Sequence, residues 1–347
     1  METDNHIRGK RTPKGQGKKQ PSPSADDLVE GILKGDTAAL GKAITLIESN
    51  RDDHHQIANN VLQKCLSQKK ESIRIGITGV PGVGKSTFIE TLGGLLTEQG
   101  NRVAVLAVDP TSSQSKGSIM GDKTRMEALV KNPRAFIRPS PSGELLGGVA
   151  RKTRESTLLC EAAGYNIVLI ETVGVGQSET AVHGMVDFFL LLKLSGAGDE
   201  LQGIKRGIVE MADAIVINKA DGDNIKRAEA AAKEFKKALH LYPPKPNGWT
   251  PKTMTCSATE NTGIEAVWEM IRTYIEQTRK TGHFKEKRKQ QNRNWLFETI
   301  GERLKSEFFQ SEAVRPVIKK FEAQVMAGTL WPFQAAEQLI GRFKNKS

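Results

Sequence analysis

An eight-residue loop constrains the fold of this chain more than any other part of its sequence. Residues 79–86 read GVPGVGKS and match the pattern G-x-x-x-x-G-K-[ST] at every fixed position. The apolar run Ile73–Thr78 precedes the loop, and the helical pattern Lys85–Glu98 follows it. The glycines let backbone N–H groups turn toward phosphate oxygens, and the helix N-terminus adds partial positive charge. The order of strand, loop and helix therefore predicts a phosphate-binding loop at the edge of a sheet.

The lysine and serine that close this loop have specific chemical roles. Lys85 is predicted to reach the β- and γ-phosphates of a nucleotide, which also makes it a candidate catalytic residue. Ser86 is predicted to hold Mg²⁺ through its hydroxyl. The alternative is a chance glycine turn, which the flanking strand and helix disfavour. The residues predicted to bind the nucleotide here are Gly79, Val80, Pro81, Gly82, Val83, Gly84, Lys85, Ser86 and Thr87.

Short apolar runs alternate with helical patterns through the centre of the chain. The predicted strands are Ile73–Thr78, Val103–Val108, Ala135–Arg138, Ile167–Glu171, Phe188–Leu194, Ala214–Asn218 and Thr253–Ser257. The helices predicted between them include Lys85–Glu98, Val149–Ala162, Asn224–Leu239 and Ile264–Thr278. Several strands are continuously apolar, which is typical of strands buried on both faces. This alternation predicts an α/β fold of the P-loop NTPase class, with a mostly parallel central sheet flanked by helices.

A second motif, NKAD at residues 218–221, follows the predicted strand Ala214–Asn218 and so lies at the carboxyl edge of the sheet. The Asp221 carboxylate can accept two hydrogen bonds from guanine, whereas adenine would leave it unpaired at a penalty of about 1–3 kcal/mol or more. Ser257 and Ala258, at the end of the next strand, are candidates to give a backbone N–H to the base. The motif predicts binding of GTP or GDP rather than ATP. The residues predicted to recognise guanine are Asn218, Lys219 and Asp221.

Acidic residues are expected near the phosphates, because carboxylates hold Mg²⁺ directly or through water. Glu171 ends a predicted strand, and in the Gly-rich string after it Gly174 can turn its N–H toward the γ-phosphate. Asp109 follows the strand Val103–Val108, and Asp122 lies in a second Gly-rich loop. For each acid the alternative is a helix cap or a solvated loop position. The predicted metal ligands are Ser86, Asp109, Asp122 and Glu171, and Glu171 is also a catalytic candidate.

Helices are expected on both sides of this domain. Residues 1–23 are polar and basic and predict a disordered tail, and residues 24–70 predict a helical extension in which Asp36 is an N-cap. The P-loop GTPase domain is assigned to residues 71–282 and a helical dimerisation arm to residues 283–347. The arm is expected to hold one long helix over residues 284–310 and a second after Pro332, and to be too thin for a core of its own. Its apolar stripe predicts docking on a second copy of the chain.

The net charge of +11 is concentrated in the basic stretches 8–20 and 279–293. A nucleic-acid partner is the alternative, but Phe284 is the only Phe, Tyr or Trp in either stretch, so a solvated tail and a solvated helix face are expected. The sequence has no run of about 18 apolar residues, so no membrane span is expected. The three scattered cysteines fit a reducing, cytoplasmic compartment and no disulfide framework, and they form no CxxC pair: Cys65, Cys160 and Cys256.

With these motifs in place, the chain resembles the MeaB/ArgK/MMAA family of GTPases, which are G-protein chaperones of adenosylcobalamin-dependent acyl-CoA mutases. The strings that carry the resemblance are GITGVPGVGKSTFIETLG, AVDPTSSQSKGSIMGDKTRM, FIRPSPSGELLGGVARKTRE, IETVGVGQSE, VDFFLLLKLSGAGDELQGIKRGI and INKADGDN. The string ETVGVGQ, in place of the common DxxG, separates this family from Ras-like GTPases.

The resemblance implies a GTP-hydrolysing homodimer that gates adenosylcobalamin loading and protects or reactivates an acyl-CoA mutase, and it points to methylmalonyl-CoA mutase among these enzymes. It implies no tightly bound cobalamin, and the sequence holds no DxHxxG string. Within the Gly-rich loop Ser195–Arg206, for which an ordinary connection is the alternative, the segment from Asp199 to Arg206 would be a switch that couples hydrolysis to the mutase. The residues expected to do so are Asp199, Glu200, Gln202, Lys205 and Arg206. Hydrolysis is expected to be slow alone and stimulated by the partner up to about 10³–10⁵-fold, with Lys205 or Arg206 moving toward the nucleotide.

Two other functions share the phosphate loop. A P-loop kinase acting on a transport protein or a small molecule is disfavoured by the guanine motif and by the absence of an arginine-rich lid. A nickel metallochaperone GTPase is disfavoured because the sequence has no His-rich tract and no metal-spaced cysteine pair.

Overall fold

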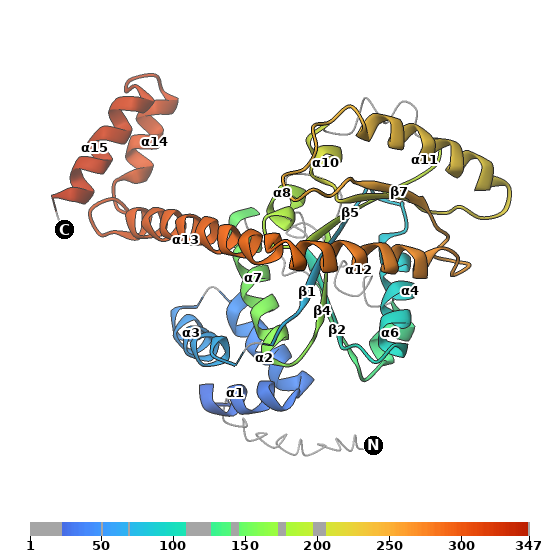
Figure 1. The fold of residues 1–347 in the computed structure, drawn as a ribbon. Helices are drawn as coiled ribbons and strands as arrows, with labels where there is room; N and C mark the ends of the chain where they lie inside the picture. Colours follow the sequence, from blue (N-terminus) through green and yellow to red (C-terminus); the bar gives the residue numbers. More distant parts are fainter. Residues whose placement is uncertain are drawn as a thin grey trace, which may run out of the picture.

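The computed structural model of the chain describes residues 23–49, 51–68, 70–108, 126–139, 146–172, 178–196 and 206–345. Within them, one parallel sheet of seven strands has the order β3-β2-β4-β1-β5-β6-β7 (Figure 1). The strands are β1 (Ile73–Thr78), β2 (Val103–Val108), β3 (Ala135–Arg138), β4 (Ile167–Thr172), β5 (Phe188–Lys193), β6 (Ala214–Ile217) and β7 (Lys252–Thr255). The predicted α/β fold is confirmed. β1 lies in the centre of the sheet, between β4 and β5.

Both faces of the sheet are buried. Successive side chains of a strand point to opposite sides, and in this sheet each side meets an apolar core. In β4, Ile167 and Leu169 belong to one apolar core, and Val168 and Ile170 belong to the other. Burial on both sides explains why β4 and β5 are apolar throughout rather than alternating.

Among the described residues, the helices on the first face are α4 (Lys85–Glu98), α6 (Glu127–Lys131) and α12 (Ile264–Lys280). Those that pack on the opposite face are α7 (Leu146–Ala162), α8 (Ser178–His183), α10 (Arg206–Met211) and α11 (Ile225–Leu239). A short 3₁₀ turn, η1 (Gly222–Asn224), leads into α11. The helices therefore form the two outer layers expected for crossover connections between parallel strands.

The N-terminal extension packs against α7, and Glu48 in it forms an ion pair with Arg138 of the edge strand β3. It consists of α1 (Ala25–Lys34), α2 (Thr37–Glu48) and α3 (Asp52–Leu66). Asp36 caps α2, since its Oδ1 accepts a hydrogen bond from the backbone N of Ala38 at 2.8 Å. The predicted N-cap is confirmed.

The C-terminal arm consists of α13 (His283–Gln310), α14 (Ile318–Met326) and α15 (Pro332–Lys344). In Figure 1 the far end of α13 carries α14 and α15 away from the sheet. The expectation that this tail has no core of its own is wrong. The helix α14, which the sequence pattern did not indicate, pairs with α15 and buries a small apolar cluster of Val314, Phe321, Ala335 and Leu339.

The basic stretch 279–293 also differs from its prediction as a solvated helix face. The Arg288 side chain is only 18% exposed and forms an ion pair with the buried Asp187. Asp187 is remote in sequence, so the pattern of α13 alone could not show this partner.

Most predicted strand bounds are confirmed to within a residue, but β7 ends earlier than expected. Ser257 leaves the parallel ladder and forms an isolated antiparallel bridge with Thr262. Among the helices in the described parts of the chain, none is long and apolar enough to cross a membrane.

Candidate nucleotide-binding site

The predicted phosphate loop leaves the carboxyl end of β1 and leads directly into α4. Lys85 begins α4, and its Nζ donates hydrogen bonds to the backbone oxygens of Gly79 at 2.8 Å and Val80 at 3.2 Å. Burial lowers the pKa of Lys85, while the charges of Glu171 and Glu179 oppose that shift. The ammonium group therefore lies against the loop, close to two acidic side chains.

Two glycines of the loop are required by the space around them. Gly84 caps α4 with a φ of 90°, and a Cβ there would lie 2.7 Å from Nδ2 of Asn218. A Cβ on Gly79 would lie 2.5 Å from the backbone oxygen of Leu192 in β5. Any larger residue would push the loop away from the strands that hold it.

Ser86 and Glu171 lie side by side at the carboxyl edge of the sheet. The Ser86 Oγ donates a hydrogen bond to Oε1 of Glu171 at 3.2 Å, and Glu171 is only 9% exposed. The ends of the two supporting strands are tied together, since Thr172 Oγ1 donates to Thr78 Oγ1 at 2.8 Å. A hydroxyl and a carboxylate are oxygen ligands of the kind that Mg²⁺ takes, so these two residues fit the predicted ion.

Asn218 joins the phosphate loop to the base-recognition motif. Its Nδ2 donates to the backbone oxygen of Val83 at 2.9 Å, and its Oδ1 accepts from the backbone N of Ala258 at 3.2 Å. One buried amide thus connects three loops that follow β1, β6 and β7. Direct contact of Asn218 with guanine stays a prediction.

The Asp221 carboxylate is held in place by the loop after β7. Ser257 Oγ donates to Oδ2 of Asp221 at 2.5 Å and itself accepts from the backbone N of Glu260 at 3.1 Å. Lys219, two residues earlier, has a φ of 58°, which is uncommon for a residue other than glycine and marks a tight turn. The motif therefore presents its carboxylate from a constrained loop.

The backbone N–H groups proposed for the base both have acceptors within the protein. The N–H of Ser257 donates to the Thr262 oxygen at 2.9 Å, and that of Ala258 donates to Asn218. Their contact with the base stays a prediction. What the structure adds is a side-chain role for Ser257, which orients Asp221.

Several predicted site residues lie outside the described residues. These are Asp109, Asp122, Gly174, Asp199, Glu200, Gln202 and Lys205. Arg206 begins α10, but its side chain is not described. Their roles at the metal, the γ-phosphate and the switch stay predictions.

Glu179 is a functional candidate that the sequence reasoning missed. It lies in the first turn of α8 and is 3% exposed, and its charge opposes the lowering of the Lys85 pKa by burial. The signal that could have indicated it is its position at the start of a helix directly after the Gly-rich string that follows Glu171.

The sequence matches a protein family model over most of its length. The model is described as "Methylmalonyl Co-A mutase-associated GTPase MeaB" and matches residues 40–313. This range includes the phosphate loop, Glu171, the NKAD motif and the whole of α13.

Similar proteins cover nearly the whole chain. A "Putative GTPase" of Caulobacter vibrioides is 49% identical, over 93% of this chain and 99% of its own length. The "Methylmalonic aciduria type A homolog, mitochondrial" of Mus musculus is 45% identical, over 92% of this chain and 80% of its own length. A crystal structure of a "LAO/AO transport system kinase" superimposes with a TM-score of 0.71 at 36% identity and covers 92% of this chain and 97% of that chain.

Proposed function

This chain belongs to the MeaB family of mutase-associated GTPases, and from that premise we propose that it gates adenosylcobalamin loading of an acyl-CoA mutase and protects or reactivates that enzyme. The protein is a P-loop GTPase, as its relatives are named. Its partner is proposed to be methylmalonyl-CoA mutase, and the observation that supports this choice is the family match over residues 40–313.

The described residues support GTP binding in two ways. The phosphate loop and Lys85 bind the phosphates, and Asp221, oriented by Ser257, accepts hydrogen bonds from guanine. Asn218 connects the phosphate loop to the loop after β7, because its amide forms hydrogen bonds with Val83 in the first loop and Ala258 in the second.

Hydrolysis needs groups that neutralise the charge developing on the γ-phosphate. Mg²⁺, held by Ser86 and Glu171, would supply part of that charge when bound. Lys85 supplies another cation from within the loop. Lys205 or Arg206 is proposed to add a further cation when the partner binds. Full partner-stimulated turnover in Lys205→Ala would exclude that role for Lys205.

A homodimer is proposed to be held partly by the C-terminal arm. Apolar side chains on α13 face solvent, including Leu296, Phe297 and Leu304 at 58%, 59% and 56% exposure. A groove of about 560 Å³ between α13, α14 and α15 continues this apolar surface. Tightly bound cobalamin is not proposed for this chain.

The partner proposal is tested by co-elution with purified methylmalonyl-CoA mutase in size-exclusion chromatography. The protein is loaded with a non-hydrolysable GTP analogue, with GDP, or with no nucleotide, and the analogue is expected to change the amount of complex. Asp221→Asn in the presence of the GTP analogue is the control, because it should behave like nucleotide-free protein. No complex in any state would exclude this mutase as the partner.

A kinase function is the second candidate, because the structure at 36% identity is described as a transport system kinase. It requires transfer of a phosphoryl group from a nucleotide to an acceptor, and the oriented Asp221 carboxylate disfavours ATP as the donor. Label transfer from γ-³²P-ATP to an acceptor protein, with GTP inert, would favour the kinase.

A further inference from the structure

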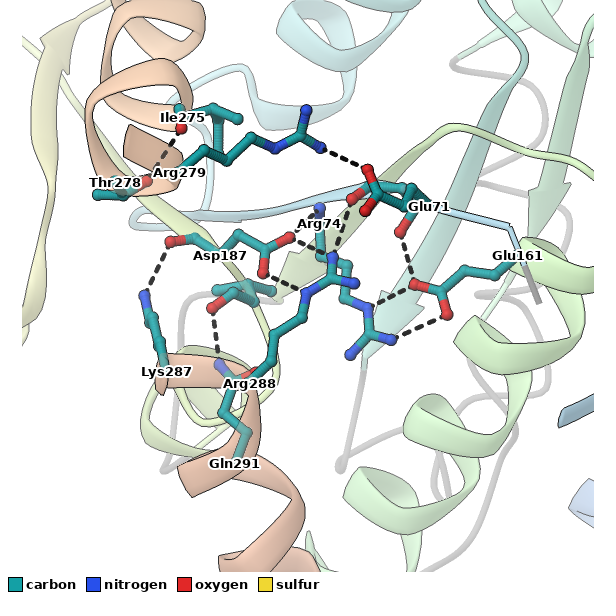
Figure 2. Close-up of polar contacts among 12 residues, drawn as sticks. Glu71, Arg74, Glu161, Asp187, Ile275, Thr278, Arg279, Lys287, Arg288 and Gln291 are labelled. Carbon is teal, nitrogen blue, oxygen red and sulfur yellow. Dashed lines mark hydrogen bonds and ion pairs between the residues drawn. The ribbon is translucent and has the colours of Figure 1, made fainter. Parts of the chain in front are cut away.

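Side chains at the start of α13 hold the turn between α8 and β5. Lys287 Nζ donates to the backbone oxygen of Asp187 at 2.8 Å, and Gln291 Nε2 donates to the backbone oxygen of Val186 at 2.8 Å. Arg288 lies between them on the helix and binds the Asp187 carboxylate (Figure 2). We call these three side chains the α13 clamp. They bind the last two of the four residues, 184–187, that connect the end of α8 to the first residue of β5.

The Arg288–Asp187 pair also holds the beginning of the central strand. Arg288 Nε and Nη2 donate to the two carboxylate oxygens of Asp187 at 2.8 and 2.7 Å, and Nη2 also donates to the backbone oxygen of Ser72 at 2.9 Å. Asp187 Oδ2 accepts from the backbone N of Arg74 at 2.8 Å. A single guanidinium therefore links α13 to the starts of both β1 and β5.

The same network extends to α7 through a second buried pair. Arg74 Nε and Nη2 donate to the carboxylate of Glu161 at 2.7 and 2.9 Å, and Ser72 Oγ donates to Glu161 Oε1 at 2.5 Å (Figure 2). Burial alone would raise the pKa of Glu161, but Arg74 and Ser72 lower it, so the pair stays charged. Buried pairs of this kind hold one geometry, because separating them would leave an uncompensated charge.

On the other side of the clamped turn, α8 packs directly on the backbone of β1. A Cβ on Gly76 would lie 2.9 Å from Val182, 2.9 Å from Phe189 and 3.1 Å from Val186. The ring of His183 meets Phe189 edge to face, with the ring centroids 5.4 Å apart. Val182 of α8 thus lies against β1 with no room for a side chain on Gly76, and the clamp holds the exit of the same short helix.

This helix and this strand carry groups of the nucleotide site at their other ends. α8 begins at Ser178 and holds the buried Glu179 in its first turn, and β1 leads into the phosphate loop that Lys85 closes. We propose that Lys287, Arg288 and Gln291 are positioning residues for GTP hydrolysis, because they fix α8 and β1 from the arm. This inference rests on the GTPase activity and goes beyond the role of the arm in dimerisation.

The mildest test leaves the buried ion pair intact. The double variant K287M/Q291M removes the hydrogen bonds to the Asp187 and Val186 backbone but keeps Arg288 on the Asp187 carboxylate. The matched control is K289M/Q290M on the same helix, because both side chains are exposed and Lys289 pairs with Glu286 within α13.

The readouts are the single-turnover rate of GTP hydrolysis, the Kd for a fluorescent GDP analogue, the melting temperature and the mass in solution. For K287M/Q291M we expect a rate loss of roughly tenfold, because small misplacement of catalytic groups slows the chemical step more than it weakens binding. The Kd and the mass should stay at the wild-type values, and the control should match wild type in all four measurements.

An unchanged rate would overturn the inference. A rate loss that is matched by an equal loss of GDP affinity would also overturn it, since the clamp would then be a structural anchor only. The assay contains no mutase, so its result is independent of whether the proposed partner is correct.

Discussion

At the residue scale, Gly84 and Asn218 form a contact on which the geometry of the phosphate loop depends. Gly84 has a left-handed φ of 90°, and the amide of Asn218 occupies the place where a Cβ would lie. The same amide holds the Val83 oxygen. The absence of a side chain on Gly84 therefore lets the phosphate loop lie against Asn218 of the NKAD motif.

Gly84→Ala should weaken GDP binding on the order of 10–100-fold, because the strained backbone and the collision with Asn218 both displace the loop. Gly282→Ala is the matched control, since Gly282 also caps a helix at positive φ, 76°, but has nothing within 4 Å. Isothermal titration calorimetry measures both. Equal losses in the two variants would contradict the role given to Asn218.

His183 provides a pH test at the end of α8. Its pKa is lowered to about 4, because burial disfavours the charged ring and Lys287 repels it, while Asp213 opposes the shift and Lys245 adds to it. In the unfolded chain a histidine titrates near pH 6.5. Between these two pKa values, lowering the pH protonates the unfolded state but not the folded state, so folding stability falls.

The free energy of unfolding should therefore decrease by on the order of 2–3 kcal/mol more in wild type than in His183→Gln as the pH falls from about 6.5 to 4. Urea unfolding at a series of pH values measures the difference. His240→Gln, at an exposed histidine, is the control and should follow wild type. Identical pH profiles for wild type and His183→Gln would contradict the burial of this ring in its neutral form.

At the element scale, the packing of α8 on β1 depends on Gly76. Gly76→Ala should destabilise the protein by about 1–3 kcal/mol, because three buried side chains would have to move. Gly94→Ala in α4 meets nothing within 4 Å and should be neutral or stabilising by up to about 1 kcal/mol. Thermal unfolding of the two variants distinguishes these outcomes, and a neutral Gly76→Ala would show that α8 has room to shift.

The elements themselves were largely predictable from the sequence, for a physical reason. Strands such as β1 and β2 are short, continuously apolar and bounded by polar turns, so their ends are marked in the sequence. β7 is a polar edge strand and was placed less accurately. The helix α14 was missed because only Phe321 within it is buried, which leaves a weak apolar pattern.

The site was predictable where one motif carries it and not where distant residues meet. The phosphate loop and Asp221 follow from local patterns. The hydrogen bond from Asn218 to Val83 and the pair of Arg288 with Asp187 join residues 135 and 101 positions apart. No local pattern encodes such partners, since the fold alone brings them together.

At the scale of the whole molecule, the arm presents an apolar surface that a second copy is expected to cover. Leu304→Glu introduces a charge into this surface and should weaken dimerisation by at least about tenfold. Leu241→Glu is the control, because Leu241 is 87% exposed and lies outside the arm. Analytical ultracentrifugation over a concentration series measures both. A wild-type monomer at all concentrations would contradict the proposed dimer.

The central claim is that this protein is a GTPase whose specificity for guanine resides in Asp221. The most direct measurement is single-turnover hydrolysis of GTP, ATP and XTP by wild type and by Asp221→Asn. Wild type should hydrolyse GTP and leave ATP intact. In Asp221→Asn the rate of GTP hydrolysis should fall by roughly 100-fold or more, and the rate of XTP hydrolysis should rise, because the 2-oxo group of xanthine accepts a hydrogen bond from the new amide. Equal hydrolysis of ATP and GTP by wild type, or an Asp221→Asn variant that still prefers GTP, would contradict the account.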